Sequence, residues 1–100
     1  MSVLIEFAIF PTDHGESKSK YVARVIDMIK ASGLKYQLTP MGTILECESV
    51  AEGLSVTERA YTELEVDCSR IYSTIKIDYR KNHSDRMSRK IQSVESKLNS

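Results

Sequence analysis

Residues 36–48 read YQLTPMGTILECE, and this stretch decides which fold the chain can adopt. Apolar side chains alternate over residues 34–38, the segment PMG follows, and residues 43–48 form a second run of strand-like composition. Two short strands joined by a turn that contains proline and glycine are typical of a β-hairpin. The hairpin places Glu46 inside a sheet, where an acidic side chain in so small a protein needs a structural or functional reason.

One strand and one helix are predicted on each side of the hairpin. Before it, apolar residues alternate in the opening stretch that ends at Pro11, and residues 18–32 have helical spacing, with Ser17 as the expected N-cap. After it, residues 49–66 have helical spacing, and RIYSTIKIDYR (residues 70–80) alternates between an apolar and a polar face. The chain therefore has the order strand, helix, strand, strand, helix, strand.

The end of the chain adds a third helix and completes the fold class. From Asp85 onward, charged residues surround a narrow apolar stripe at helical spacing, which is typical of an amphipathic helix that docks on a surface. The order βαββαβ predicts an α+β, ferredoxin-like sandwich with an additional C-terminal helix, in a single domain of residues 1–100. In this topology the sheet order is four, one, three, two, and the first two helices cover one face. The apolar stripe of the third helix comprises Met87, Ile91, Val94 and Leu98.

The alternation in the strands assigns side chains to the two faces of the sheet. The apolar stripes of the first and last strands are expected to face the helices, which leaves Glu6, Glu46, Thr74 and Lys76 on the opposite face. Three interpretations of Glu46 stay open. It could form a general acid and base pair with Glu6, it could pair with Lys76 across strands, or it could bind a ligand by accepting hydrogen bonds from an amino-heterocycle or by facing a cation.

Composition excludes several classes of partner. Fourteen basic and fourteen acidic residues give zero net charge, which provides no overall attraction for nucleic acid or an anionic membrane surface. The opening MSVLIEFAIF is apolar, but it lacks a basic start and a cleavage site and is too short to span a bilayer. A cytoplasmic protein with reduced thiols is expected. Cys47 and Cys68 lack CxxC or Cys/His spacing, so no metal site is predicted.

The sequence contains no recognisable catalytic constellation. A nucleophilic site needs a histidine within reach of a serine or cysteine, but His14 and His83 lie in predicted polar loops, where histidines are usually exposed. The glycine-rich phosphate motifs and the nucleophile elbow are absent. The stretch SKSKY offers the hydroxyls of Ser17 and Ser19 and free backbone N–H groups, which suit either helix capping or ligand contact. The protein is therefore not expected to be an enzyme.

Four stretches together resemble a known family. They are FAIFP at the end of the first strand, SKSKYVARV at the start of the first helix, GLKYQLTPMGTILE across the hairpin, and RIYSTIKIDYR in the last core strand. In these stretches the chain is similar to the small thiamine-binding proteins related to YkoF, which are single ferredoxin-like domains. The resemblance implies a homodimer or homotetramer that binds thiamine or its hydroxymethylpyrimidine part.

The resemblance also implies ligand contacts at particular positions. Carried over residue by residue, it assigns them to Ser17 and Ser19 in the helix-start motif and to Thr43 and Glu46 in the hairpin motif. Glu6 is added from the sheet order alone. No cofactor and no catalytic residue are implied.

The resulting prediction is a cytoplasmic homo-oligomer that binds thiamine or a related hydroxymethylpyrimidine compound without turnover. One departure from the family bears on the ligand, since Cys47 stands where the family often has a smaller residue and could narrow a pocket. Two alternatives remain. The first is a structural or regulatory interaction module without a small-molecule ligand, and the second is a small α+β enzyme that uses Glu6 and Glu46.

Overall fold

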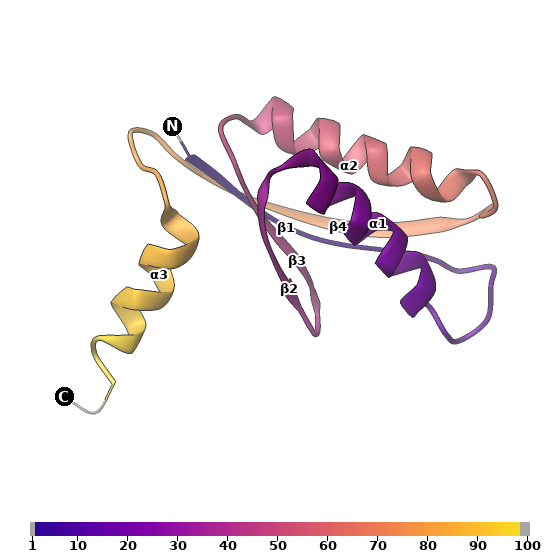
Figure 1. Cartoon of the computed structure of the whole chain (residues 1–100), viewed down its shortest axis with the longest axis horizontal. Coiled ribbons are helices and arrows are strands. Elements are labelled where there is room, and N and C mark those ends of the chain that lie inside the picture. The colour runs from indigo at the N-terminus through magenta and orange to yellow at the C-terminus, as the bar shows by residue number, and fades with distance from the viewer. Residues whose placement is uncertain (1, 99–100) are drawn as a thin grey trace.

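The computed structural model describes residues 2–98, and its elements follow the predicted order (Figure 1). Residues 1, 99 and 100 of the predicted domain lie outside the described part. In chain order the elements are β1 (Ser2–Pro11), α1 (Ser19–Ser32), β2 (Lys35–Thr39), β3 (Gly42–Cys47), α2 (Val50–Glu65), β4 (Ile71–Arg80) and α3 (Arg86–Glu95). Each predicted helix and strand is confirmed, with bounds that differ from the expected ones by one or a few residues.

The four strands form one antiparallel sheet in the order β2-β3-β1-β4, as the ferredoxin-like topology predicts. The helices α1 and α2 pack side by side on one face of this sheet, whereas α3 stands apart from them beyond the end of β4 (Figure 1). The sheet therefore has a helix face, covered by α1 and α2, and an open face. Within residues 2–98 no helix is both long and apolar enough to cross a membrane.

The predicted assignment of side chains to the two faces is confirmed. Ile5 is fully buried on the helix face and pairs with Leu45 on one side and Ile77 on the other. On the open face, Glu6 pairs in register with Lys76. The helix face is packed closely, because a Cβ on Gly53 of α2 would lie 1.8 Å from the Ile5 Cδ1 atom. A glycine at this point of α2 lets the helix approach β1.

The capping residues of the first two helices differ in how well the sequence predicts them. The C-cap of α1 is Gly33 with φ 80°, a left-handed conformation that glycine adopts without steric cost. The predicted N-cap at Ser17 is wrong, since the first helical hydrogen bond runs from the Val22 amide to the Lys18 carbonyl, so the N-cap is Lys18. In α2, Ser49 is the N-cap and its hydroxyl accepts from the Glu52 amide.

The helix α3 docks on the protein through its first turn. Met87 is 6% exposed, whereas Ile91, Val94 and Leu98, later in the same apolar stripe, are 44%, 62% and 61% exposed. The buried Arg86 side chain donates to the Asp78 carboxylate and to the Asp78 carbonyl on β4. The amphipathic helix is therefore confirmed, but most of its apolar stripe faces solvent in the single chain.

Candidate functional site

A cavity of about 440 Å³ lies between α1, the end of β1 and the β2–β3 turn. Its walls are mostly aliphatic and aromatic, and they include Phe7 and Ile9 from β1, Val22 and Ile26 from α1, and Leu38 from β2. Volumes of 300 to 1,000 Å³ with predominantly apolar walls are usual for sites that bind small molecules. The volume and the apolar lining of this cavity suit a small organic ligand.

The turn that forms one wall of the cavity is fixed by its own residues. The Thr39 hydroxyl accepts from the amides of Met41 and Gly42 at 3.2 and 3.1 Å and donates to the Gly42 carbonyl. A Cβ on Gly42 would lie 2.9 Å from the Phe7 carbonyl oxygen, so only glycine lets the turn lie this close to β1. The sequence TPMG therefore sets both the shape of the turn and its distance from the strand beneath it.

Few polar side chains line this cavity. Thr43 contributes from β3, where its side chain is 5% exposed on the helix face, and Lys18 contributes from the start of α1. The Lys18 ammonium group donates to the Gly15 carbonyl in the preceding loop. No aspartate or glutamate is among the cavity-lining residues in the described part of the chain. The lining is thus apolar, with one cation and two threonine hydroxyls, of which that of Thr39 is engaged within the turn.

The two predicted contact residues at the start of α1 are the sequence neighbours of a residue that lines this cavity. Ser17 and Ser19 flank Lys18 and are both exposed. Neither is a lining residue, and the side chain of the N-cap residue between them makes no capping hydrogen bond. The structure therefore brings Thr43 and the Lys18 segment together at one cavity and leaves the two serine hydroxyls in solvent.

Glu46 lies on the other face of the sheet, at a different hollow. Its carboxylate accepts from the Ser2 hydroxyl at 2.8 Å and from the amides of Arg86 and Met87 at 2.7 and 3.2 Å. Partial burial opposes ionisation of Glu46, but these three hydrogen bonds together outweigh it and lower its pKa. Amides at a helix start have no partner within the helix, so Glu46 acts as the cap that α3 lacks locally.

Asp85, the residue at the N-cap position of α3, makes no capping hydrogen bond with its own side chain and has φ 53°. Its carboxylate instead pairs with the Lys35 ammonium group at 2.5 Å. Glu46 therefore supplies the missing acceptor from β3, 40 and 41 residues earlier in the chain than the amides it accepts from. This explains the acidic side chain inside an apolar strand.

One of the three open interpretations of Glu46, a cross-strand pair with Lys76, is wrong. In the sheet order β1 lies between β3 and β4, so the two residues are not on neighbouring strands. Lys76 pairs instead with Glu6, its register partner, at 3.7 Å between the ammonium nitrogen and the carboxylate oxygen. Glu6 lies in a shallow hollow of the open face that also includes Lys90. Each of the two glutamates thus has its own partners on the open face.

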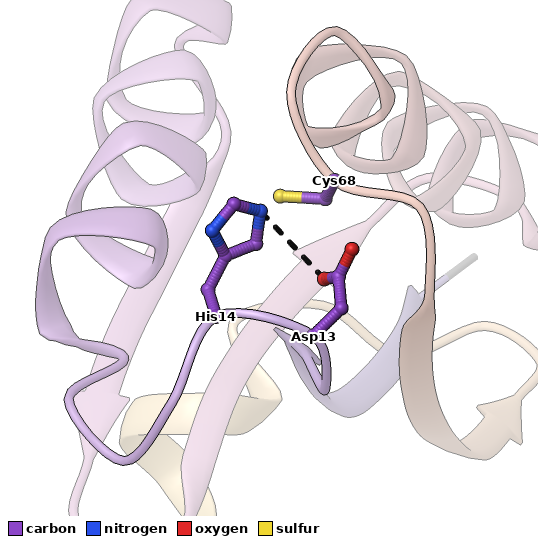
Figure 2. A group of neighbouring side chains, drawn as sticks. All are labelled: Asp13, His14 and Cys68. Carbon is purple, nitrogen blue, oxygen red and sulfur yellow. Dashed lines mark ion pairs between the residues drawn. The ribbon is translucent and has the colours of Figure 1, made fainter.

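One group of side chains was missed in the sequence. Asp13 and His14, from the loop after β1, meet Cys68, from the loop before β4, with candidate ligand atoms all within 4.8 Å of one another (Figure 2). A search for short Cys/His spacings could not find them, because Cys68 is 54 positions after His14 in the chain. The topology contained the signal, since Pro11 ends β1 in register with Ile71 at the start of β4, which brings the two loops together.

The chain matches a family model described as "Thiamine-binding protein" over residues 5–95. It is 34% identical over 95 residues to the UPF0045 protein Mb1933 of Mycobacterium bovis, which covers 95% of this chain and 93% of that protein. It is 35% identical over 92 residues to the UPF0045 protein MJ1052 of Methanocaldococcus jannaschii, with 92% and 91% covered. These matches confirm the resemblance found in the sequence.

Solved structures confirm the fold. The crystal structure of MJ1052 superposes with a TM-score of 0.84 at 34% identity and covers 94% of this chain and 96% of that one. TM0486 of Thermotoga maritima, assigned provisionally to thiamine biosynthesis or salvage, superposes with a TM-score of 0.81 over 94% of this chain and 99% of its own. Its identity of 21% supports the shared fold alone.

Proposed function

Because the chain belongs to the thiamine-binding protein family, we propose that it binds thiamine or a related hydroxymethylpyrimidine compound without turnover. We assign the ligand to the cavity between α1 and the β2–β3 turn. The observation that supports this assignment is that three of the four family-like stretches contribute residues to this cavity. FAIFP lines it with Phe7 and Ile9, SKSKYVARV with Lys18 and Val22, and the hairpin stretch with Thr43.

The chemistry of the cavity favours one half of the ligand over the other. Thiamine joins a neutral, flat aminopyrimidine to a cationic thiazolium ring. Apolar walls suit the flat neutral ring, and the Thr43 hydroxyl can hydrogen-bond to its nitrogen atoms. A cationic ring beside the Lys18 ammonium group and without a carboxylate nearby would be repelled. The pyrimidine is therefore placed inside the cavity, and the thiazolium ring outside its mouth on the side of Ser17 and Ser19, where water screens its charge from the Lys18 ammonium group.

Glu46 and Glu6, which the sequence suggested as ligand contacts, take no part in this arrangement. Both lie on the open face of the sheet, whereas Thr43 faces the helices. Three of the roughly four lone-pair sites of the Glu46 carboxylate already accept hydrogen bonds, from Ser2 and from the start of α3. The proposal therefore keeps Thr43, Ser17 and Ser19 from the sequence prediction as ligand contacts and replaces the two glutamates by the apolar cavity walls.

Calorimetric titration tests the proposal. Both thiamine and free hydroxymethylpyrimidine should bind the wild-type chain with one site per chain. Val22→Phe should abolish binding, because the larger ring fills the space between α1 and the turn. The matched control is Ala23→Phe, at an exposed position one residue further along the same helix, which should keep binding. Absence of heat with both compounds at millimolar concentration would remove the proposal.

Self-association of this cytoplasmic protein is part of the same proposal. β4 lies at the edge of the sheet, and Tyr72, Ile75, Ile77 and Tyr79 along it are between 38% and 55% exposed. A long apolar edge strand is a surface that proteins normally cover. Sedimentation should detect a dimer or tetramer, which Ile77→Lys weakens while the same substitution at the exposed Thr74 does not. A monomeric wild-type protein at high micromolar concentration would contradict this part.

A further inference from the structure

The loops after β1 and before β4 bring three different metal-binding side chains to one point. The Thr12 amide donates to the Arg70 carbonyl at 2.9 Å and so extends the pairing of β1 with β4 beyond Pro11. This bond holds Asp13 and His14 opposite Cys68. Figure 2 shows the carboxylate, the imidazole ring and the sulfur atom pointing toward a common centre. Among residues 2–98 this is the one group of three or more His, Cys, Asp or Glu side chains whose candidate ligand atoms all lie within 4.8 Å of one another.

Each of the three side chains is held in place by neighbours. One Asp13 carboxylate oxygen accepts from the Ser69 amide at 2.7 Å, and the other lies 3.7 Å from the His14 Nε2 atom. The imidazole ring lies against the Tyr21 ring, with centroids 5.0 Å apart. Cys68 is 7% exposed, whereas the side chains of His14 and Asp13 are about one third exposed, at 32% and 29%. The group is therefore held by protein contacts at the buried Cys68 and is accessible to solvent at Asp13 and His14.

We propose that Asp13, His14 and Cys68 bind a borderline divalent cation of the Zn²⁺ type. Thiolate, imidazole and carboxylate are the three kinds of ligand that Zn²⁺ uses in proteins, whereas Mg²⁺ and Ca²⁺ take oxygen ligands. Zinc-ligand bonds of about 2.0 to 2.3 Å place tetrahedral ligand atoms roughly 3.3 to 3.8 Å apart, so ligand atoms that now lie up to 4.8 Å apart need to approach by at most about 1.0 to 1.5 Å. Water completes the coordination from the exposed side.

Binding exchanges protons for the metal. His14 Nε2 lies 2.6 Å from the Asp67 carbonyl oxygen and donates to it in the metal-free protein. To bind the cation, this nitrogen must be unprotonated, with the proton on Nδ1 instead. Burial and the Asp67 and Asp13 carboxylates raise the pKa of the Cys68 thiol, so it is protonated at neutral pH in the metal-free protein. A sulfur-metal bond therefore forms as the sulfur-hydrogen bond breaks, and the proton leaves to solvent.

The charges around the group suit a dication. The Asp67 carboxylate is already paired with the Arg24 guanidinium at 2.9 Å, so the two neutralise each other. Asp13 and the Cys68 thiolate then supply two negative charges to the cation. The Asp13 carboxylate, which opposes ionisation of the thiol in the absence of a metal, stabilises the metal-bound state.

Titration of the reduced, chelator-treated full chain with Co²⁺ and then Zn²⁺ tests the site. One equivalent of Co²⁺ should produce thiolate-to-cobalt charge-transfer absorption, which Zn²⁺ then removes by displacement. Cys68→Ala should abolish this absorption, and Cys47→Ala, the matched substitution at the other buried free cysteine, should leave it unchanged. His14→Gln and Asp13→Asn should each weaken Co²⁺ binding at least about tenfold.

These titrations distinguish metal binding by Asp13, His14 and Cys68 from nonspecific metal binding elsewhere on the protein. If the Cys68 variant does not fold, the partly exposed positions 13 and 14 decide the matter. The proposal is overturned if wild-type protein gives no charge-transfer absorption, or if the absorption survives Cys68→Ala. It is equally overturned if the absorption is lost in Cys47→Ala, or if neither His14→Gln nor Asp13→Asn weakens binding. Metal bound without such absorption would be an adventitious ion only.

Discussion

Thr43 and Glu46 lie three residues apart in the same strand, yet they belong to opposite faces of the sheet and to different structures. Thr43 is buried on the helix face and lines the apolar cavity beside α1. Glu46 points to the open face, where its carboxylate caps the first turn of α3. An odd spacing in a strand always separates two side chains in this way. The motif Met-Gly-Thr-x-x-Glu therefore combines a cavity residue with an anchor for the terminal helix.

Glu46→Ala gives the largest expected effect on the open face. It leaves the amides of Arg86 and Met87 without their acceptor, so we expect a loss of about 2 kcal/mol in the free energy of unfolding. Urea unfolding measures this loss, and hydrogen exchange should show faster exchange in α3. Affinity for a hydroxymethylpyrimidine ligand should be unchanged. A variant that keeps α3 protected but loses the ligand would reverse the roles assigned to the two faces.

Acid should release α3 by the same mechanism. The pKa of Glu46 is lower in the folded chain than its ordinary value of 4.5, so its stabilising contribution is present above that value and is lost as pH falls through the folded pKa. The Lys90 and Arg86 side chains lower the pKa of Asp78 likewise, and the Lys35 side chain lowers that of Asp85. Hydrogen exchange along an acid titration should show α3 opening before the sheet. Simultaneous loss of α3 and the sheet would contradict this order.

Thr43→Val should have a smaller effect, on the helix face alone. It removes one hydroxyl from the cavity with little change in side-chain shape. The loss of one hydrogen bond to the ligand should raise the dissociation constant roughly tenfold. Calorimetry measures the change. Thr74→Val, at an exposed position on β4, is the matched control and should bind as tightly as wild type. An equal loss in both variants would mean that the hydroxyl of Thr43 does not contact the ligand.

Glu6→Gln should have the smallest effect of all. Within residues 2–98 the ion pair of Glu6 is with Lys76, whose side chain is 81% exposed, and such surface pairs contribute about 0.5 kcal/mol or less. Stability and ligand affinity should both stay within experimental error of wild type. A large loss of ligand affinity in this variant would instead support the sequence prediction that Glu6 contacts the ligand.

The fold was predictable from the sequence because its signals are local and repeated. Alternation over ten residues of β1 and β4 set the faces, and the hairpin between two helices set the sheet order. The same alternation also separates Thr43 from Glu46, which the family resemblance treated as one motif. Applying the strand period to that motif would have placed the two residues on opposite faces without a structure.

Other parts of the site depend on contacts that no local pattern encodes. The role of Glu46 follows from how α3 returns to the sheet, because its N-cap residue Asp85 leaves the first amides free. The single-residue error at Ser17 arose because Ser, Lys and Ser all stand near the start of α1, and backbone hydrogen bonds alone decide which one is the cap. The meeting of His14 with Cys68 follows from the pairing of β1 with β4, which the predicted topology contained.

The central claim, that the ligand lies on the helix face while Glu46 serves α3, can be tested most directly by amide chemical shifts. Titration of the labelled full chain with hydroxymethylpyrimidine should move the amide signals of Val22 and Gly42, which lie at the cavity. The signals of Arg86 and Met87, whose amides donate to Glu46, should stay in place. Shifts at Arg86 and Met87 with unmoved signals at Val22 and Gly42 would contradict the account and place the ligand at Glu46.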